Sequence, residues 1–473
     1  MQTNVYDSIV IGAGMSGLAA AIRLAMFDKN VLVLEKHIIP GGLNSYYQRG
    51  KRQFDVGLHA LTNFAKKEEK NKPLGKLLKQ LRIKHEELKL KEQSFSLIQF
   101  PHKTIQFNND FNQFLNQIEI HFPEDYQDFL NLVQLINDFN EVSLSNKDES
   151  ARSKLSSILK NVDLIEMILA PLLIYGSAWE NDMDFSQFVI MFKSIYMEGF
   201  ARPDGGVRTI IDLLMNKYKA LNGKIQFKTG VSKIEKFSEH FKVTLESGEE
   251  LFCKKVFSSM GYPETMNIVE GSVASQLKSN LEIGKLTFCE SIFVTRNKMD
   301  KSNTEATIIF YNDQAKYHYQ QAEDYFDDRS AVLCFTDNFN NSDYSSEGIV
   351  RVTFMANYEL WKNLKDSSNA FYLKKKEEVA EASLKILKKA IPHLELDIVF
   401  KDVFTPTTIT RYTSHFQGTV YGSTTKTRNG KTSIPGLYII GTDQGFLGIV
   451  GSMLSGISMA NLYGLMEGDN HAL

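Results

Sequence analysis

A glycine-spaced turn between a strand-like and a helix-like segment constrains the fold of this chain most. Residues 5–12 (VYDSIVIG) are apolar and β-branched and end at a glycine, a pattern typical of a buried strand. The turn Gly12-Ala13-Gly14-Met15-Ser16-Gly17 follows, residues 15–29 have the pattern of a helix, and residues 30–36 (NVLVLEK) have that of a second buried strand. This order predicts a β–α–β unit that opens a parallel sheet.

The glycines of this turn have separate physical roles. Gly12 permits a tight turn, Gly14 lets the backbone approach a pyrophosphate, and Gly17 lets the helix pack close to the strand. Glu35 ends the second strand, where a carboxylate can accept hydrogen bonds from both ribose hydroxyls and would repel a 2′-phosphate. The unit predicts a dinucleotide site but does not separate FAD from NAD. The contacts predicted here are Gly12, Gly14, Met15, Ser16, Gly17, Glu35 and Lys36.

Two later glycine-rich segments favour FAD. Gly41-Gly42 would bring bare backbone to the dinucleotide again, although Pro-Gly-Gly is also ordinary turn chemistry. Residues 434–465 predict a strand ending at Gly441, then Asp443, then a helix start, which would place a carboxylate near the ribityl hydroxyls and a helix dipole near the flavin N1/O2 edge. A packing helix is the alternative interpretation. The contacts added are Gly41, Gly42, Leu43, Gly441, Asp443, Gly448, Ile449, Val450 and Gly451.

The pattern along the chain predicts an α/β protein with two interleaved domains. Residues 66–204 are mainly helical with a hairpin at 95–107, and residues 284–400 alternate strands with one charged helix. We therefore predict a Rossmann-type FAD-binding domain with a parallel sheet, interleaved with a mixed sheet-plus-helix substrate domain. The FAD-binding domain is predicted at 1–65, 203–265 and 425–473, and the substrate-binding domain at 66–202 and 266–424.

Several segments together resemble the FAD-dependent carotenoid desaturase, carotenoid isomerase and retinol saturase superfamily, that is, the phytoene desaturase-like flavoproteins. Residues 40–61 (PGGLNSYYQRGKRQFDVGLHAL) are similar to the family segment that leads from Gly-Gly through an aromatic strand to an FD-x-G beside the flavin. RPDGGVRTI resembles the family's YPxGG turn and helix. TGVSKI resembles its strand in which a valine, here Val231, holds the adenine. The cofactor contacts that the resemblance adds are Gly57, Leu58, His59 and Val231.

The C-terminal segments resemble one branch of that superfamily more than the other. Residues 404–422 are similar to the TPLT…Y…G..YG block of the retinol saturase and isomerase branch, and GTDQGFLGIVGSMLSG is similar to its flavin-binding end. Two departures concern the substrate: Leu43 replaces a common arginine or serine, and Ser259-Met260-Gly261 replaces Asn-Ala-Asp. The resemblance therefore implies FAD but does not name the substrate.

His59 and Tyr412 are the predicted catalytic residues. His59 follows the FD-x-G segment at the expected edge of the reaction cavity, where an imidazole could donate a proton or orient a substrate; a structural histidine is the alternative. Arg411 and His415 are weaker candidates of the same kind. Residues 179–200 are rich in Met and aromatic side chains, which predict core, or as a group an apolar tunnel.

These features favour a flavin oxidoreductase that acts on a carbon–carbon double bond of a long apolar substrate, such as a carotenoid, a retinoid-like polyene or an unsaturated fatty acyl chain. Saturation, desaturation and cis–trans isomerisation all fit. The sequence has no second GxGxxG unit and no CxxC, so the flavin would exchange hydride with the substrate, with a diffusing donor or acceptor such as NAD(P)H, or with oxygen. A flavin amine oxidase of the same fold and a non-catalytic lipid or prenyl carrier are the alternatives; Leu43 disfavours the first, and Glu35 with Asp443 disfavours the second.

Composition limits the other possibilities. The net charge is −2, from 54 Lys and Arg against 56 Asp and Glu, which gives no electrostatic basis for nucleic-acid binding. Cys253, Cys289 and Cys334 show no metal or CxxC spacing and suggest a reducing, cytoplasmic compartment. We expect no secretory signal and no membrane span, since a span needs about 20 apolar residues. An apolar substrate suggests peripheral membrane contact through residues 155–200, although a buried core is expected for most of that segment.

Overall fold

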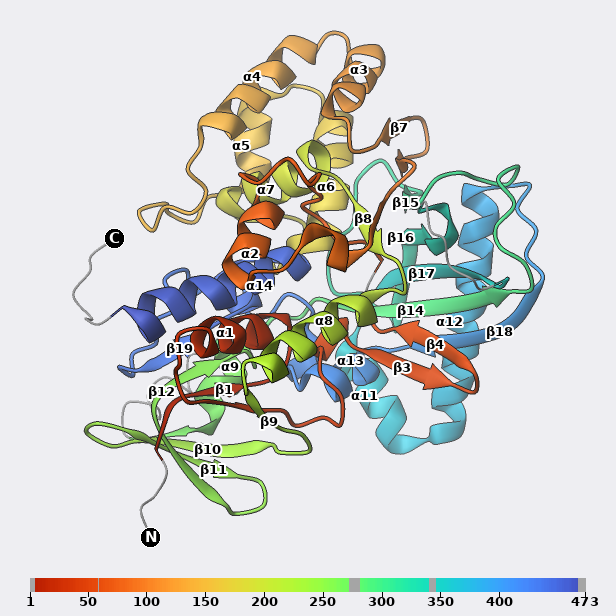
Figure 1. The fold of residues 1–473 in the computed structure, drawn as a ribbon. Coiled ribbons are helices and arrows are strands. Elements are labelled where there is room, and N and C mark those ends of the chain that lie inside the picture. The colour runs from red at the N-terminus through yellow and green to blue at the C-terminus, as the bar shows by residue number, and fades with distance from the viewer. Residues whose placement is uncertain (1–4, 58, 272–280, 340–345, 467–473) are drawn as a thin grey trace.

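The computed structural model of the chain describes residues 5–57, 59–271, 281–339 and 346–466. Two sheets dominate it, one at the lower left of Figure 1 and one at the right, and a group of helices lies above them. The result is the α/β architecture predicted from the sequence. Leu58, one of the predicted cofactor contacts, lies outside the described residues.

The first sheet has eight strands in the order β13-β10-β11-β12-β1-β2-β9, with β19 paired to β12. The pairs β1–β2, β1–β12, β2–β9 and β12–β19 are parallel, so the carboxyl ends of these strands share one edge of the sheet. An antiparallel hairpin, β10–β11, extends the other end. The strands are β1 (Val5–Ile11), β2 (Val31–Leu34), β9 (Lys224–Gln226), β10 (Val231–Lys236), β11 (Phe241–Leu245), β12 (Glu250–Ser258), β13 (Val269–Glu270) and β19 (Leu437–Ile439).

The second sheet has seven strands in the order β18-β14-β17-β16-β15-β6-β7 and is antiparallel except between β15 and β6. Helices α11 (Tyr358–Ser367) and α12 (Asn369–Ala390) share an apolar core with it. The strands are β6 (Ser96–Gln99), β7 (Thr104–Phe107), β14 (Thr287–Thr295), β15 (Ile308–Asn312), β16 (Phe326–Phe335), β17 (Gly348–Ala356) and β18 (Ile398–Phe404). All of them fall within the predicted substrate segments, and the strands of the first sheet fall within the predicted FAD segments except β13. The domain boundaries themselves stay a prediction.

A helical layer fills the upper part of Figure 1 and packs on the second sheet. Helix α6 is buried on nearly every side because its sequence is apolar all round, which is the pattern of a core helix. The helices of this layer are α3 (Phe111–His121), α4 (Tyr126–Asp138), α5 (Ala151–Ile158), α6 (Val162–Gly176) and α7 (Phe185–Phe192). Helix α2 (Pro73–Leu81) packs instead on α1 and α14.

The aromatic segment at 179–200 belongs to this core. Phe188, Phe192 and Tyr196 are fully buried and pack on one another, and no residue of 179–200 lines the cavity described below. The expectation of a tunnel from that segment is therefore wrong, because Phe192 of α7 packs on Phe111 of α3 and Phe129 of α4. The segment 155–200, considered for membrane contact, is likewise mostly buried, with Val162 as an exposed exception.

Two helices run side by side over the first sheet. Helix α1 (Met15–Ala25) packs against α14 (Gly448–Met459), as Figure 1 shows. A Cβ at Gly456 would lie 2.1 Å from the Ser16 carbonyl oxygen of the other helix, so the glycine is what permits the contact. The other elements are β3 (Tyr46–Arg49), β4 (Arg52–Asp55), β5 (Leu90–Glu92), β8 (Ala201–Pro203), α8 (Val207–Ala220), α9 (Tyr262–Ile268) and α13 (Pro406–Thr413).

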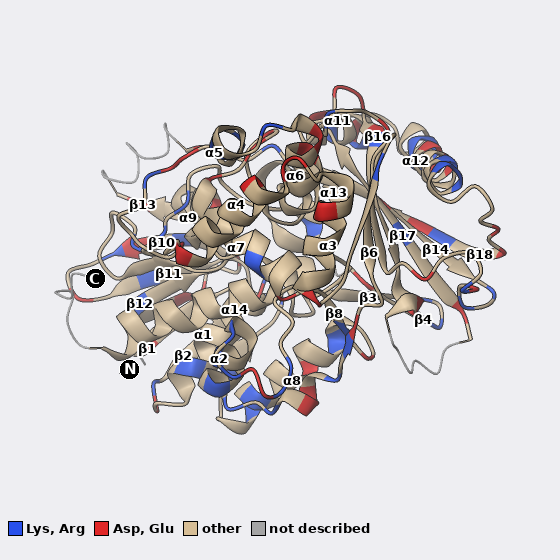
Figure 2. Cartoon of the chain, turned by 90° about the horizontal axis from the view of Figure 1, so that it is seen from above, with Lys and Arg blue, Asp and Glu red and all other residues tan. Residues whose placement is uncertain are grey.

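Figure 2 shows both signs of charge interspersed along the outer helices α8 and α12. Within the described ranges, every helix is too short or too polar to cross a bilayer. All three cysteines are free and buried.

Candidate functional site

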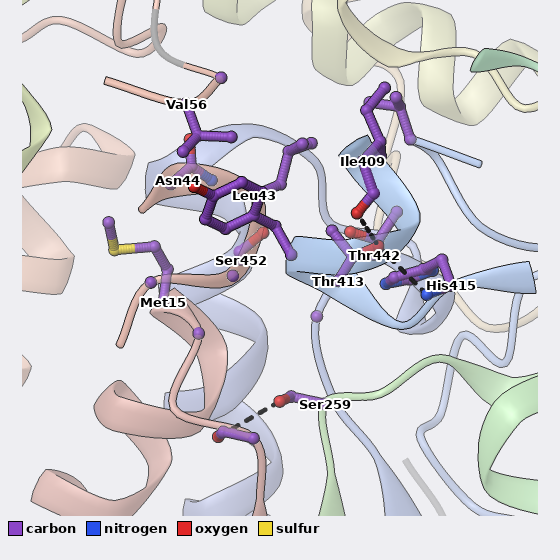
Figure 3. Close-up of a pocket in the computed structure, with 18 of the residues that line it drawn as sticks. Met15, Leu43, Asn44, Val56, Ser259, Ile409, Thr413, His415, Thr442 and Ser452 are labelled. Atoms are coloured by element: carbon purple, nitrogen blue, oxygen red, sulfur yellow. Dashed lines mark hydrogen bonds between the residues drawn. The ribbon is translucent and has the colours of Figure 1, made fainter. Parts of the chain in front are cut away.

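One cavity of about 330 Å³ opens where the parallel strands of the first sheet end. Residues that follow β1, β2, β12 and β19 line one part of it, and residues of β14, β17 and α13 line another. Figure 3 shows Met15 and Ser452 on one side and Ile409 and Thr413 of α13 on the other, with Leu43 between them. The cavity therefore lies between the two sheets and touches both.

Two glycine turns meet on its wall. Gly14 and Gly41 form a parallel bridge, and the Gly41 N–H donates to the Ala13 carbonyl at 2.9 Å. Gly12 and Gly41 have φ of +93° and +113°, which side chains rarely tolerate. A Cβ added at Gly14 or Gly42 would meet no atom within 4 Å, so the backbone of both turns faces open space. The PGG segment thus meets the first glycine turn.

Two helix N-termini also open onto the cavity without a side-chain cap. Gly14 precedes α1 and Leu447 precedes α14, and neither offers a side-chain acceptor to the first N–H groups. Met15 and Ser16 of α1, and Gly448 and Ile449 of α14, line the cavity. Uncapped N–H groups and the positive dipole end make each terminus a place for negative charge.

Glu35 lies beside the first of these termini and is 8% exposed. Its Oε2 accepts a hydrogen bond from the Ala13 N–H at 2.7 Å, and its Oε1 accepts one from the His37 N–H at 2.8 Å. Each carboxylate oxygen retains a lone pair for a hydroxyl donor. Lys36 forms an exposed ion pair with Glu246 at 2.9 Å, at the rim of the cavity.

Asp443 has a role that the sequence did not indicate. Its carboxylate is 1% exposed; Oδ2 accepts from the Tyr262 N–H at 2.6 Å, and Oδ1 accepts from the Ser423 N–H at 2.8 Å. Lys426 Nζ lies 3.4 Å from Oδ1, and burial lowers the pKa of that lysine while Asp443 opposes the shift. The carboxylate lines the cavity but also joins three separate segments of the chain.

The other part of the cavity is apolar. Its wall comes from helix α6, from the second sheet and from the residues around α13 and α14. Apolar and aromatic residues here are Leu43, Val56, Ile174, Tyr175, Phe288, Val332, Phe404, Ile409, Tyr421 and Leu447. An apolar lining with few polar groups is what ligand sites for hydrocarbon groups require.

A charged cluster interrupts this apolar wall at His59. The imidazole Nε2 lies 3.1 Å from Glu290 Oε2 and 3.1 Å from Thr353 Oγ1. Arg351, which is 2% exposed, donates from Nε to Glu290 Oε1 at 2.6 Å and pairs with the same oxygen through Nη2. Arg202 Nη1 donates to the His59 carbonyl at 3.0 Å. Three elements, β14, β17 and β8, therefore hold the histidine in place.

Burial and charge set the protonation of the cluster. Burial lowers the pKa of His59 below its ordinary value, although Glu290 acts in the opposite direction. Burial alone would raise the pKa of Glu290, but the charge of Arg351 and the hydrogen bond from His59 outweigh it, and that pKa lies below its ordinary value. Glu290 is therefore ionised and His59 neutral at neutral pH.

Tyr412 lies in a different part of the cavity from His59. Its ring stacks on His37, with 5.4 Å between centroids and 8° between planes, and no contact among the described residues joins it to His59. Arg411 contributes its carbonyl oxygen, 2.5 Å from His37 Nε2. The two predicted catalytic residues are thus not brought together, because α13 places Tyr412 beside the residues that follow Glu35.

His415 lines the cavity next to a buried carboxyl group. Its Nδ1 lies 3.9 Å from Glu264 Oε1, and that oxygen accepts a hydrogen bond from the Phe416 N–H at 2.7 Å. Burial raises the pKa of Glu264, and the nearby His415 opposes the shift. The described residues form no group of His, Cys, Asp or Glu that could hold a metal ion.

A family model for flavin-containing amine oxidoreductases matches residues 15–462. The chain belongs to this family. Prolycopene isomerase of Daucus carota is 25% identical over 508 residues, which cover 97% of this chain and 80% of the relative. Human all-trans-retinol 13,14-reductase is 47% identical over 53 residues, which cover 11% of this chain and 9% of the relative. Both are of the kinds that the sequence resembles, so the predicted superfamily is confirmed.

The solved structure of an oxidoreductase from Methanosarcina mazei has the same fold. It superposes with a TM-score of 0.68 at 16% identity, over 96% of this chain and 99% of that chain. FAD is the cofactor, as predicted, and the residues present fit it. The two uncapped helix N-termini suit the pyrophosphate and the flavin N1/O2 edge, and Glu35 suits a ribose.

Not every predicted FAD contact lines the cavity. Gly17 does not, because its Cβ position lies 2.0 Å from the Gly12 carbonyl oxygen, in the close helix–strand contact predicted for it. Val450 and Gly451 do not line it either, because both are buried, Val450 at 0% exposure. Of the described predictions, the cavity is lined by Gly12, Gly14, Met15, Ser16, Glu35, Lys36, Gly41, Gly42, Leu43, Gly57, His59, Val231, Gly441, Asp443, Gly448 and Ile449.

Sequence reasoning missed Glu290, Arg351 and Thr353. A signal for them exists, since Glu290 and Arg351 are single charged residues inside the otherwise apolar strands TFCESIFVT and GIVRVTFMA. A charge in a buried strand requires a partner. Nothing in the order of the residues says that the partner lies across the sheet and that the pair meets His59.

Proposed function

We propose that this chain is an FAD-dependent oxidoreductase that saturates, desaturates or isomerises a carbon–carbon double bond of a long apolar substrate. The observation that carries the proposal is that one cavity joins a dinucleotide cradle to an apolar chamber whose wall holds one charged cluster. The names of the two relatives, a prolycopene isomerase and an all-trans-retinol 13,14-reductase, support a polyene or retinoid-like substrate. An unsaturated fatty acyl chain has the same chemistry.

FAD, when bound, accepts or gives a hydride. The residues of this chain supply the rest. The apolar wall binds hydrocarbon and excludes water, with about 0.8 kcal/mol for each buried methylene group. Leu43 and Ile409 extend the apolar wall toward the glycine turns. His59 presents its imidazole at the charged cluster that interrupts this wall. The cofactor contacts at Glu35, Gly14 and Ile449 would hold the dinucleotide so that the reacting carbon lies beside its ring.

The cluster at His59 favours this function over oxidation of an amine. An amine substrate arrives as a cation, which a free carboxylate would attract. Glu290 is not free for such a cation, because Arg351 pairs with it at 2% exposure and His59 binds its other oxygen. A non-catalytic lipid carrier would need no dinucleotide cradle, so the uncapped helix N-termini and Glu35 argue against that function.

The experiment uses the purified protein, its flavin released by denaturation and identified by mass. The FAD-loaded protein is then incubated without oxygen with a carotenoid, a retinoid and an unsaturated fatty acid, with the flavin oxidised or chemically reduced. We expect a lipid whose double bonds change in number or geometry, in one flavin state only. NADPH and NADH are tested as reductants, because a diffusing nicotinamide partner is part of the proposal. Retained FAD without change in any lipid, together with peroxide formation when amines are supplied in air, would contradict it.

A further inference from the structure

The imidazole of His59 uses one nitrogen for the protein and leaves the other accessible. Nε2 binds Glu290 Oε2 and Thr353 Oγ1, both at 3.1 Å. Nδ1 forms no hydrogen bond with the described part of the chain and is not a buried unpaired atom. Because the His59 side chain is 12% exposed and lines the cavity, the accessible nitrogen opens onto that cavity.

Arg351 fixes the side of the imidazole that carries the proton. It binds Glu290 Oε1 through Nε at 2.6 Å, and its Nη2 also donates to the Val56 carbonyl at 2.8 Å, just before the segment that carries His59. A guanidinium beside a buried carboxyl group keeps it ionised, and a carboxylate only accepts hydrogen bonds. The network therefore assigns the proton to Nε2 and leaves a lone pair on Nδ1 in the neutral ring.

We infer that His59 exchanges the substrate proton through Nδ1, and that Glu290 and Arg351 are positioning residues that set its tautomer and orientation. The inference rests on the proposed function and names the residues that serve it. The arrangement is similar to other histidine–carboxylate pairs, in which the carboxylate orients the imidazole ring and stabilises the imidazolium that forms. Here the partner nitrogens are exchanged, with Nε2 toward the carboxylate and Nδ1 toward the cavity.

The step balances as follows when a double bond forms. One C–H bond of the substrate breaks, and hydrogen leaves with the electron pair as a hydride to oxidised FAD. The neighbouring C–H bond breaks, its proton binds Nδ1, and its electron pair becomes the new π bond. FAD gains two electrons, the substrate loses two, and His59 gains one proton and becomes a cation beside Glu290. Saturation runs through the same atoms in reverse, from reduced FAD and protonated His59.

Several charged and titratable groups face His59 from the elements packed against it. Glu290 comes from β14, Arg351 from β17 and Arg202 from β8. Tyr175 of α6 lies with its ring centroid 6.5 Å from the imidazole, and Cys334 Sγ of β16 lies 3.9 Å from the His59 carbonyl. Asp55 pairs with Arg202 one layer further out. Burial lowers the pKa of His59 below its ordinary value, so the neutral ring is present at neutral pH.

This protonation state gives the two directions opposite pH profiles. Double-bond formation needs the neutral ring, so its rate falls as the pH drops through the His59 pKa. Saturation needs the protonated ring, so its rate falls as the pH rises through the same value. Glu290 raises the pKa of His59, so E290Q moves both profiles to lower pH. A role confined to packing would change stability and leave the profiles in place.

The first test does not depend on turnover. Protein labelled with ¹⁵N-histidine is titrated by NMR, and H59Q identifies the His59 signals. We expect the proton on Nε2, and a lower His59 pKa in E290Q. The control is E166Q, because Glu166 is also a buried carboxylate (2% exposed) paired with an arginine, Arg152, but does not line the cavity. E166Q leaves the His59 signals unchanged. A proton on Nδ1 in the wild type overturns the inference.

The second test measures turnover of the lipid found for the wild type. H59Q is expected to lower kcat by about 10²-fold to 10⁴-fold, and E290Q by about 10-fold or more with a shifted pH profile, while FAD content stays unchanged. E166Q keeps the wild-type profile. If H59Q retains kcat within about threefold, the inference is overturned while the proposed function stands. If the wild type changes no lipid, the proposed function fails, and the inference fails with it.

Discussion

Arg202 forms a buried ion pair with Asp55, and the same guanidinium donates to the carbonyl of His59 at 3.0 Å. Asp55 in turn accepts the Val207 N–H at the start of α8 at 3.1 Å. A Cβ at Gly206 would lie 2.6 Å from an Asp55 oxygen, so glycine is required there. The FDVG and RPDGG segments, far apart in the sequence, therefore form one structural unit that carries the candidate catalytic histidine.

This pair gives a prediction for stability. Asp55→Asn removes the carboxylate that pairs with the Arg202 guanidinium, which is 7% exposed. We expect the free energy of unfolding to fall by about 3 kcal/mol, because removing one partner of a buried ion pair is strongly destabilising. Urea unfolding followed by circular dichroism measures it. The matched control is Asp397→Asn, whose partner Arg296 is 65% exposed; it should unfold as the wild type does. Equal effects of the two variants would contradict the account.

Glu35 gives a prediction for cofactor retention. Glu35→Ala removes the carboxylate that lines the cavity beside the first helix N-terminus. We expect the Kd for FAD to rise by about 10-fold or more, since a hydrogen bond to a charged group contributes about 1.5–3 kcal/mol. Fluorescence of released flavin after gel filtration measures it. Glu246→Gln, which neutralises the exposed partner of Lys36 and does not line the cavity, is the control and should retain FAD. Unchanged retention in Glu35→Ala would show that this carboxylate does not hold the cofactor.

The cofactor half of the site could be predicted from sequence because its signals are local. Gly12, Gly14 and Gly41 stand where the backbone must turn or must lie bare beside the cavity. The residue type alone indicates such positions, because only glycine lacks a side chain. The contacts of Asp443 could not be predicted, because its backbone partners at Tyr262 and Ser423 come from distant segments. The fold brings them together only after both sheets have formed.

The substrate half of the site was harder to predict from the sequence, because its contacts also join distant segments. The Glu290–Arg351 pair depends on the antiparallel register of β14 and β17, where Glu290 lies opposite Thr353 and Arg351 opposite Ile292. No local pattern encodes that register. The placement of Tyr412 beside His37 depends on where α13 docks, which the sequence block around it does not contain.

Gly14 and Gly17 give a paired prediction in which similar changes have different outcomes. A Cβ at Gly14 meets no atom within 4 Å, and its φ of −72° suits any residue, so Gly14→Ala should fold normally but place a methyl group in the pyrophosphate cradle. At Gly17 the Cβ would lie 2.0 Å from the Gly12 carbonyl oxygen, so Gly17→Ala should destabilise the fold by about 1–3 kcal/mol.

FAD titration and urea unfolding of both proteins separate the two effects. Gly14→Ala is expected to weaken FAD binding with little change in the apoprotein's unfolding midpoint. Gly17→Ala is expected to lower that midpoint. If both variants lose stability alike, the Gly14 backbone does not face the cofactor in the way described here.

Glu198 gives a prediction for stability against pH. Burial raises its pKa to about 7 from the ordinary 4.5, although Asn63 donates a hydrogen bond to it at 2.9 Å. Between these two values the folded state binds a proton that the unfolded state has lost, so stability should decrease as the pH rises from about 4.5 to about 7. The stabilising contribution is present at low pH and is lost through the folded-state pKa.

Glu198→Gln places a neutral side chain of the same shape at this position and directly tests the predicted pH dependence of stability. The variant should lose the part of the pH dependence that Glu198 causes, and it should be more stable than the wild type at about pH 8, where the buried carboxylate is charged. Unfolding free energies across that range measure the difference, with Glu141→Gln as the control because Glu141 is a partly exposed carboxylate paired with Lys193. Parallel curves for Glu198→Gln and the wild type would mean that Glu198 titrates at its ordinary pKa in the folded protein.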